Sequence, residues 1–233
     1  MSDFKQIAEG KALIFAPKEK KVSKKLPVFY NPAMKLNRDI SVLLLNSIKN
    51  KDMQIALPLA GTGVRGARFL LELNKNKIKN ISMNDYNGKA SKIIEQNLKL
   101  NKIKKTKKIS ITKKDANLFL LESSGFDYID IDPFGTPNYF LDSAVKRLAR
   151  EGILAVTATD TSALAGSFPA ACKRKYWAVP IREELKHEIG LRILIRKVQL
   201  IGAQFDKALT PIFSYAEQHY MRAFFYCEKG KHK

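Results

Sequence analysis

Short apolar segments alternate with amphipathic ones along most of this chain, and this alternation limits its possible folds more than any other feature. Short apolar runs bounded by turn residues predict strands, whereas apolar residues at every third or fourth position predict helices. Strands that alternate with helices build a mostly parallel sheet with helices on both of its faces. The segments with strand character are 53–60, 80–85, 108–116, 126–132, 152–160 and two within 208–230.

Segments with helical spacing separate these strands. The predicted helices lie within 31–50, 67–75, 88–102, 138–150 and 181–205, the last of them broken near Gly190. The final two strands are joined by a short turn and therefore run antiparallel. We predict a Rossmann-like α/β fold with a mostly parallel seven-stranded sheet, helices on both faces and a terminal antiparallel hairpin strand.

The composition is that of a globular protein in a reducing compartment. With 233 residues, 45% of them hydrophobic, the chain suits one main domain, which we expect at 31–233, after a basic N-terminal appendage at 1–30. It has no apolar run of about 18 residues and no signal sequence, so we expect a cytoplasmic protein with no membrane partner. Cys172 and Cys227 are the only cysteines, so we expect no disulfide framework and no metal site, and we expect Cys172 to be a buried thiol. The oligomeric state stays open, with a monomer as the expectation.

The charge balance points to a polyanionic partner. Lys and Arg total 42 against 22 Asp and Glu, which gives a net charge of +20. Nucleic acid is the partner that such a charge suits best. A chain that uses lysine only as a solubilising charge would have the same composition, so the charge alone does not decide between the two.

A glycine-rich loop follows the first of the predicted strands. The sequence GTGVRG matches the pattern GxGxxG at Gly61, Gly63 and Gly66, and Asp85 follows 19 residues after the last glycine. Ligands bind at the carboxyl ends of the strands in such sheets, and this spacing is that of a nucleotide-binding loop whose acidic partner holds a ribose. Two ligands use this geometry, NAD(P) and S-adenosylmethionine. A tight turn from strand to helix gives the same pattern.

Other residues favour S-adenosylmethionine over a dinucleotide. This ligand has no phosphate, and its carboxylate can pair with Arg65 or Arg38, with Arg68 as an alternative to Arg65. Asp115 ends the third strand, where its carboxylate and the amide of Ala116 can hold adenine. A dehydrogenase does not require an aspartate at that position.

The stretch DYIDIDPFGTP ends the fourth strand with Asp132, Pro133 and Phe134. A carboxylate and a fixed backbone carbonyl can together accept both hydrogens of an exocyclic amine. They orient the weakly nucleophilic nitrogen and stabilise the charge that develops on it. Phe134 can stack on a base that has been extruded from its helix. A structural turn with a core phenylalanine is the alternative.

Three stretches together resemble the archaeal and eukaryotic tRNA (guanine-26-N2) dimethyltransferases. They are DIDPFG, FYNPAMKLNRD from Phe29 to Asp39, and TATDTSALAG…CKRKYWAVPIREELKHEIGLRILI within 157–195. The resemblance covers nearly the whole chain. It implies a class I methyltransferase fold, S-adenosylmethionine as the cofactor, tRNA as the partner, and methylation of the N2 amine of guanine 26 once or twice.

The resemblance also implies roles for single residues. The amine would be bound by Asp132, and the guanine would be sandwiched by Phe134 and Phe29. The cofactor would be held by Arg38, Gly61, Gly63, Arg65, Asp85, Asp115 and Ala116.

The chain departs from the family pattern in two places. Pro58 stands where methyltransferases often have an acidic residue at the end of the first strand. Family members also continue into a C-terminal domain, which we expect to be absent from a chain of this length.

Three other functions remain as alternatives. A DNA or rRNA amino-methyltransferase commonly has a second proline after Asp-Pro, which is missing after Pro133. An NAD(P) dehydrogenase would leave the Asp132 stretch unexplained. A catalytically silent RNA-binding domain would have the same positive net charge as an RNA methyltransferase. In both of these RNA-binding proteins, the basic segment KRKYW, predicted as a loop at 173–177, would suit phosphate and stacking contacts.

Overall fold

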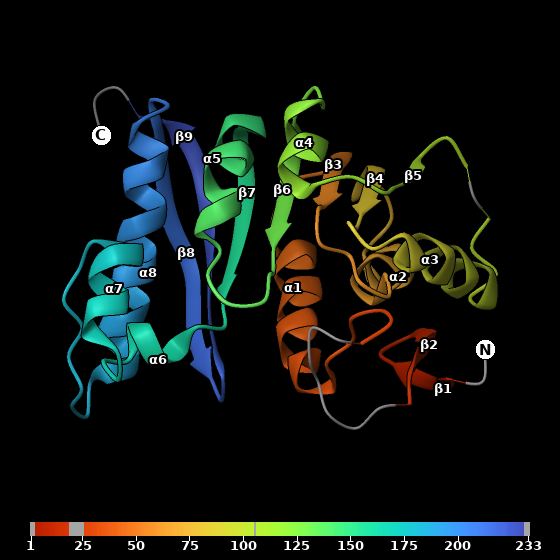
Figure 1. The fold of residues 1–233 in the computed structure, drawn as a ribbon. Helices are drawn as coiled ribbons and strands as arrows, with labels where there is room; N and C mark the ends of the chain where they lie inside the picture. The colour runs from red at the N-terminus through yellow and green to blue at the C-terminus, as the bar shows by residue number, and fades with distance from the viewer. Residues whose placement is uncertain (1–2, 19–25, 105, 231–233) are drawn as a thin grey trace. The chain divides into compact units, whose positions relative to one another are not determined.

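The computed structural model describes residues 3–18, 26–104 and 106–230, so most of the basic run at 18–25 and Lys105 lie outside the described part. The chain divides into two compact units, Met1–Phe119 and Leu120–Lys233 (Figure 1). Among the described residues, no helix is long and apolar enough to cross a membrane.

The first unit holds three parallel strands of the main sheet, in the order β5-β4-β3. A small antiparallel hairpin, β1 with β2, precedes them. The elements of this unit in chain order are β1 (Phe4–Glu9), β2 (Ala12–Pro17), η1 (Pro32–Met34), α1 (Lys35–Ser47), β3 (Met53–Leu57), α2 (Val64–Glu72), β4 (Ile78–Asn84), α3 (Gly88–Leu100) and β5 (Ile109–Thr112). A short helix, α4 (Ala116–Leu121), runs across the boundary.

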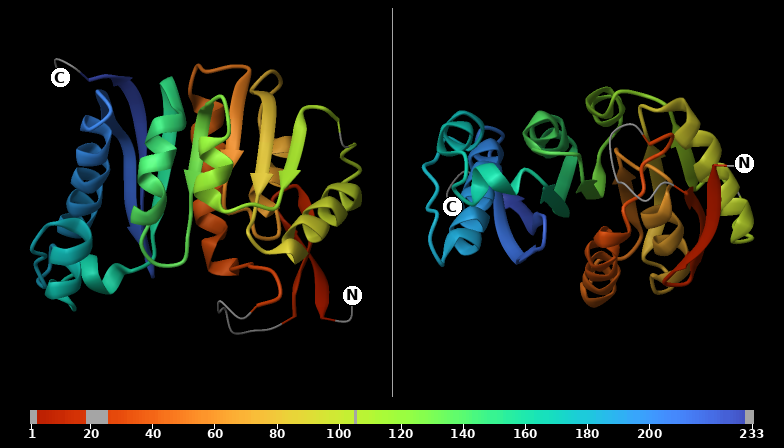
Figure 2. Two further views of the ribbon diagram at one scale, coloured as in Figure 1. Left: turned by 45° about the horizontal axis from the view of Figure 1, so that its top comes forward. Right: turned by 60° about the horizontal axis from the view of Figure 1, so that its bottom comes forward.

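The hairpin of β1 and β2 is a feature that the sequence pattern did not reveal. Its strand β2 lies against α2 and α3 (Figures 1 and 2) and turns Ala12, Ile14 and Ala16 into a cluster with α2. Two asparagines at the C-terminal end of α3 bind the strand's backbone: Asn97 Oδ1 accepts the N–H of Phe15 at 2.7 Å, and the C-cap residue Asn101 likewise binds the backbone of Leu13. These side chains satisfy polar groups that an unpaired strand edge would otherwise leave exposed. The division at residue 30 stays a prediction.

The second unit holds the other four strands, in the order β6-β7-β9-β8. Strand β7 runs parallel to β6, whereas β9 pairs antiparallel with both β7 and β8. Helix α5 packs on β6 and β7, and α8 packs on β8 and β9. Its elements are β6 (Phe126–Ile131), α5 (Asn138–Arg147), β7 (Leu148–Ala158), α6 (Thr161–Leu164), α7 (Pro169–Tyr176), α8 (Lys186–Ala203), β8 (Lys207–Glu217) and β9 (Tyr220–Lys229).

The predicted fold class is confirmed: the chain has an α/β fold with a mostly parallel seven-stranded sheet and a terminal antiparallel hairpin. Three local predictions were wrong. Helix α8 continues through Gly190, where a Cβ would lie 2.5 Å from Met221 Cε, so this glycine serves close packing and does not break the helix. Helix α5 ends at Arg147 because Leu148 already pairs with Phe126 of β6. The segment predicted as a basic loop forms the last turn of α7, up to Tyr176.

Candidate functional site

The loop between β3 and α2 has a backbone conformation that glycine adopts most readily. Gly61 and Gly63 have φ angles of +54° and +74°, in the left-handed region. Space is also short: a Cβ on Gly61 would lie 2.6 Å from the carbonyl oxygen of Phe29, and a Cβ on Gly63 would lie 2.9 Å from Cγ1 of Ile94. The same Phe29 carbonyl accepts the N–H of Thr62 at 3.1 Å. The loop therefore fixes the backbone of Phe29 beside it.

Asp85 is held next to this loop by two backbone amides. Its Oδ2 accepts the N–H of Gly61 at 2.8 Å, and its Oδ1 accepts the N–H of Asn87 at 2.9 Å. A carboxylate has about four acceptor positions. Two acceptor positions thus remain on this half-buried carboxylate, whose orientation is fixed. A ribose diol has two hydroxyls and would use two such positions.

Gly66 has a different role from the other two glycines of the pattern. It lies in the first turns of α2, where a Cβ would be 2.3 Å from Sδ of Met83 on β4. The absence of a side chain lets α2 pack closely on the sheet.

Asn84, the last residue of β4, ties three strand ends together and was missed by the sequence analysis. Its Nδ2 donates to the carbonyls of Pro58 and Lys114, both at 3.0 Å. Its Oδ1 accepts the hydroxyl of Thr112 at 2.8 Å and the N–H of Lys114 at 3.0 Å. All four hydrogen-bonding positions of this fully buried amide are used. The unusual Pro58 is therefore anchored through its carbonyl.

Arg38 is buried on α1 and forms a bidentate pair with Glu9 of the hairpin. Its Nε and Nη2 atoms each donate to the Glu9 carboxylate at 2.6 Å, and Nη2 also donates to the carbonyl of Asn31. Burial alone would raise the pKa of the Glu9 carboxyl, but the hydrogen bonds and charge of Arg38 hold this pKa below its ordinary value. Tyr30 donates to the same carboxylate at 3.0 Å, and burial and Glu9 raise the pKa of its phenol.

The two arginines of α2 have different surroundings. Arg65 donates to two neutral oxygens of α1, Ser41 Oγ at 2.8 Å and Asn37 Oδ1 at 2.7 Å. Arg68 contacts carboxylates instead: Asp39 at 2.6 Å, Glu72 at 2.8 Å and Glu9 at 3.2 Å. Arg68 thus belongs to a structural ion-pair network.

Asp115 and Ala116 lie at the start of α4, where Asp115 caps the helix. Its Oδ1 accepts the N–H groups of Asn117 at 2.9 Å and Leu118 at 3.2 Å. Asp115 itself is exposed and Ala116 is buried. The cap fixes the carboxylate directly after β5.

In the second unit, the stretch from Asp132 to Gly135 forms a turn directly after β6. Asp132 is half-buried, Pro133 is buried, and the Phe134 side chain is 40% exposed. Gly135, with φ +84°, closes the turn: its N–H donates to Thr159 Oγ1 at 2.6 Å, and its carbonyl accepts the N–H of Thr159 at 2.9 Å. The turn is therefore fixed to the loop after β7.

A buried tyrosine supports the same turn from α7. The hydroxyl of Tyr176 donates to Asp160 Oδ1 at 2.6 Å and lies 3.1 Å from Thr136 Oγ1. Burial and the neighbouring Asp160 raise the pKa of this phenol, so it stays protonated. Lys175 pairs with the other oxygen of Asp160 at 3.1 Å. Since Tyr176 is buried, the RNA-stacking role that the sequence suggested for it does not hold, and among these aromatic residues only Trp177 is exposed.

Asp130, within β6, pairs with a buried side chain of the same unit. Arg222 of β9 donates to both of its oxygens, at 2.7 and 3.2 Å, and also to Thr157 Oγ1 at 2.6 Å. Tyr128 donates to Asp130 at 2.6 Å. Burial would lower the pKa of Arg222, but Asp130 raises it. The sequence pattern predicted Asp132 at the end of this strand but did not reveal the structural role of Asp130.

Two expectations concerned residues outside this set. Cys172 is fully buried, so the prediction of a buried thiol is confirmed, and burial raises the pKa of this thiol. The described part of the chain contains no group of three or more His, Cys, Asp or Glu side chains that could hold a metal ion.

Comparisons with known proteins give a consistent result. The model of the family described as "N2,N2-dimethylguanosine tRNA methyltransferase" matches residues 10–233. A tRNA (guanine(26)-N(2)/guanine(27)-N(2))-dimethyltransferase from Aquifex aeolicus is 45% identical over 233 residues, which are 97% of this chain and 59% of the relative. A tRNA (guanine(26)-N(2))-dimethyltransferase from Pyrococcus abyssi is 42% identical over 98% of this chain and 62% of the relative.

Solved structures agree with these sequence matches. The complex of Trm1 from Pyrococcus horikoshii with S-adenosyl-L-methionine superposes with a TM-score of 0.87 and 40% identity, over 97% of this chain and 62% of that one. Trm5b from Pyrococcus abyssi, at 15% identity and a TM-score of 0.66, shares the fold alone. The chain thus spans about three fifths of the length of the relatives that it matches.

Proposed function

This chain belongs to the N2,N2-dimethylguanosine tRNA methyltransferase family, and on this basis we propose that it methylates the N2 amine of guanine 26 in tRNA, with S-adenosylmethionine as the methyl donor. The observation that carries this proposal is the Asp85 carboxylate, which is oriented by Gly61 and keeps two acceptor positions for a ribose diol. In the proposal tRNA is the partner and the cytoplasm is the site of action.

The donors and acceptors of the first unit fit this cofactor. Asp85 suits the ribose hydroxyls, Asp115 and the Ala116 amide suit adenine, and the guanidinium of Arg65 suits the carboxylate of the methionine part. Arg38 is the weaker candidate for that carboxylate, because Glu9 already occupies two of its donor atoms. When bound, the cofactor supplies a methyl group on a positively charged sulfur.

The turn after β6 suits the amine of the substrate. In this proposal the Asp132 carboxylate and the carbonyl before the buried Pro133 accept the two amine hydrogens and direct the nitrogen lone pair. The turn is held by Thr159 and, through Thr136, by Tyr176, so the acceptors have fixed positions before the substrate binds. Preorganised acceptors avoid the reorganisation that water would require.

Two aromatic side chains suit the guanine ring itself. Phe134 is 40% exposed at the turn, which leaves its ring accessible for stacking on a base. Phe29 is half-buried, and its backbone is fixed beside Gly61 in the first unit. Both stacking roles are proposals that an aromatic-to-leucine substitution tests directly, since leucine keeps the apolar volume and loses the planar face.

The decisive experiment is a calorimetric titration of the full chain with S-adenosylhomocysteine, with NAD as the control ligand. We expect the chain to bind S-adenosylhomocysteine and not to bind NAD. A methyl-transfer assay on an unmodified tRNA transcript, followed by mapping of the methylated nucleotide, then tests the substrate. Mapping should read positions 26 and 27 separately, because the Aquifex relative is named for both.

The alternatives give different results in the same experiment. A dehydrogenase would bind NAD. A catalytically silent RNA-binding domain would bind the transcript and transfer no methyl group. Binding of the product together with methylation of another class of RNA or DNA would identify a different amino-methyltransferase.

A further inference from the structure

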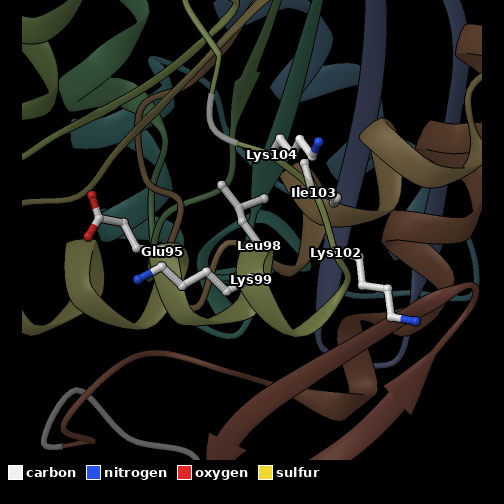
Figure 3. A pocket seen from close by; sticks show the side chains of 6 residues that line it. All are labelled: Glu95, Leu98, Lys99, Lys102, Ile103 and Lys104. Carbon is white, nitrogen blue, oxygen red and sulfur yellow. The ribbon is translucent and has the colours of Figure 1, made fainter.

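The C-terminal end of α3 borders a hollow of about 580 Å³ on the surface of the first unit (Figure 3). We call it the lysine hollow. Figure 3 shows Leu98 and Ile103 between lysines that leave its edge in different directions. It is lined by Glu95, Leu98, Lys99, Lys102, Ile103 and Lys104.

The apolar floor of the hollow follows from the way in which α3 ends. The N–H of Ile103 donates to the carbonyl of Leu98, and the N–H of Lys102 donates to that of Lys99, both at 2.9 Å. These two bonds define a Schellman motif, in which the residues at the positions of Leu98 and Ile103 normally make an apolar contact. The floor is therefore part of a rigid helix terminus.

Lys102 occupies the position of this motif that usually belongs to glycine. Its φ angle is +56°, in the left-handed region, where a residue with a Cβ is strained. A cation near a helix C-terminus is favourable, but Lys99 in the last turn already provides one without strain. A strained side chain that the helix does not need suggests a role for its ammonium group.

The surroundings of the hollow are strongly basic. Residues 99–114 contain eight lysines and no aspartate or glutamate. Lys99, Lys102 and Lys104 are all exposed, and Glu95 is the one acidic group that lines the hollow. Lysine ammonium groups bind phosphates as compact point charges, and an apolar floor suits the carbon face of a ribose.

We propose that the lysine hollow binds the ribose-phosphate backbone of the tRNA at a point remote from the methylated base. This inference rests on the proposed function for the identity of the RNA. Helix α3 begins three residues after Asp85 and runs about 20 Å to the hollow. A contact there would engage a different part of the same RNA, because Asp85 and the hollow lie at opposite ends of the helix.

The test combines a charge-removing variant with a matched control. The variant of the hollow is Lys99→Gln/Lys102→Gly/Lys104→Gln in the full chain. The control is Lys49→Gln/Lys75→Gln/Lys79→Gln, which removes the same charge at exposed positions outside the hollow. The affinity for a labelled unmodified tRNA transcript is measured from about 50 to 200 mM salt, a range over which phosphate contacts weaken steeply.

The hollow variant should bind tRNA at least about tenfold more weakly than the control. Its slope of log Kd against log salt should fall by about two to three, because each lost phosphate contact contributes about 0.7 to 0.9 to the slope. Its affinity for S-adenosylhomocysteine and its melting temperature should not fall. The single variant Lys102→Gly should melt no lower than the parent chain and still bind RNA more weakly.

Equal losses of tRNA affinity in the two triple variants would overturn the proposal. An unchanged slope of log Kd against log salt in the hollow variant would also overturn it, and this is the result expected if the hollow binds a protein partner. The proposed function is tested separately, by S-adenosylhomocysteine binding and methyl transfer in the parent chain. The RNA affinities decide the role of the hollow in either case.

Discussion

Gly61 and Asp85 are joined by a single hydrogen bond of 2.8 Å from the backbone N–H to the carboxylate, and this bond connects the loop after β3 to the end of β4. The aspartate is thus oriented by the glycine loop before any ligand arrives. The loop in turn needs the aspartate, because its amide would otherwise lack this acceptor.

Replacing Asp85 should therefore affect cofactor binding first. Asp85→Ala is expected to weaken S-adenosylhomocysteine binding by about ten- to a hundredfold, since a hydrogen bond to a charged group is worth about 1.5–3 kcal/mol. Calorimetry measures this change. Asp142→Ala, at an exposed carboxylate of α5, serves as the control and should bind the product like the parent chain. Unchanged affinity in Asp85→Ala would remove this residue from the cofactor site.

Replacing Asp132 should affect turnover and spare cofactor binding. Asp132→Asn keeps the shape of the side chain and removes its charge, so kcat for methyl transfer should fall by about a hundred- to a thousandfold. The affinity for S-adenosylhomocysteine should stay within about twofold of the parent value, because no cofactor role is assigned to this residue. A variant that loses both properties together would point to misfolding of the turn.

Tyr176 should act on turnover through the position of the turn. Tyr176→Phe removes the hydroxyl that binds Asp160 and contacts Thr136, and we expect a loss of about 1–2 kcal/mol of unfolding free energy. The methyl-transfer rate should fall, with KM for S-adenosylmethionine unchanged. Tyr139→Phe, on the exposed surface of α5, is the matched control. A purely structural role would lower stability and leave kcat at the parent value well below the melting temperature.

The buried pair of Asp130 and Arg222 should be costly to break on one side only. Asp130→Asn leaves a fully buried guanidinium without its ionic partner, so unfolding should become easier by about 3–5 kcal/mol. The double variant Asp130→Asn/Arg222→Met removes both charges and should recover much of that loss, as chemical denaturation can measure. The exposed pair of Asp142 and Lys146 should contribute about 1 kcal/mol or less.

Acid should destabilise the first unit through Glu9. The pKa of this carboxyl lies below its ordinary value of 4.5 in the folded protein, so its contribution to stability is present above that value. The contribution is lost as the pH falls from about 4.5 through the lower folded pKa. The carboxyls of Asp39 and Glu72, paired with Arg68, shift in the same direction. Glu9→Gln should therefore be less stable at pH 7 and show a shallower decline of stability in acid.

The parts of this molecule that the sequence predicted are those with a strong local pattern. The strands before Asp85, Asp115 and Asp132 are short apolar runs, and glycines at fixed spacing announce the loop at Gly61. Asn84 and Tyr176 carry no such signal, since an asparagine at a strand end or a tyrosine in a basic segment has no particular pattern. Their roles depend on partners 16 or more residues away along the chain.

The hairpin was missed for a related reason. Its apolar residues Ala12, Ile14 and Ala16 alternate over only one short strand, between basic residues that resemble an appendage. Glu9 gave no indication that it faces Arg38, because their contact arises only when the hairpin packs on α2 and α3. Long-range pairing of charges is decided by tertiary packing, which periodicity does not report.

The position of Glu9 has a practical consequence for anyone who prepares this protein. The family match begins at residue 10, which is a natural place to start a shortened expression clone. That cut would delete Glu9, strip Arg38 of both hydrogen bonds to a carboxylate, and remove one strand of the hairpin. A clone trimmed to the family boundary should accumulate as insoluble or proteolysed material, whereas one that keeps the first nine residues should yield folded protein.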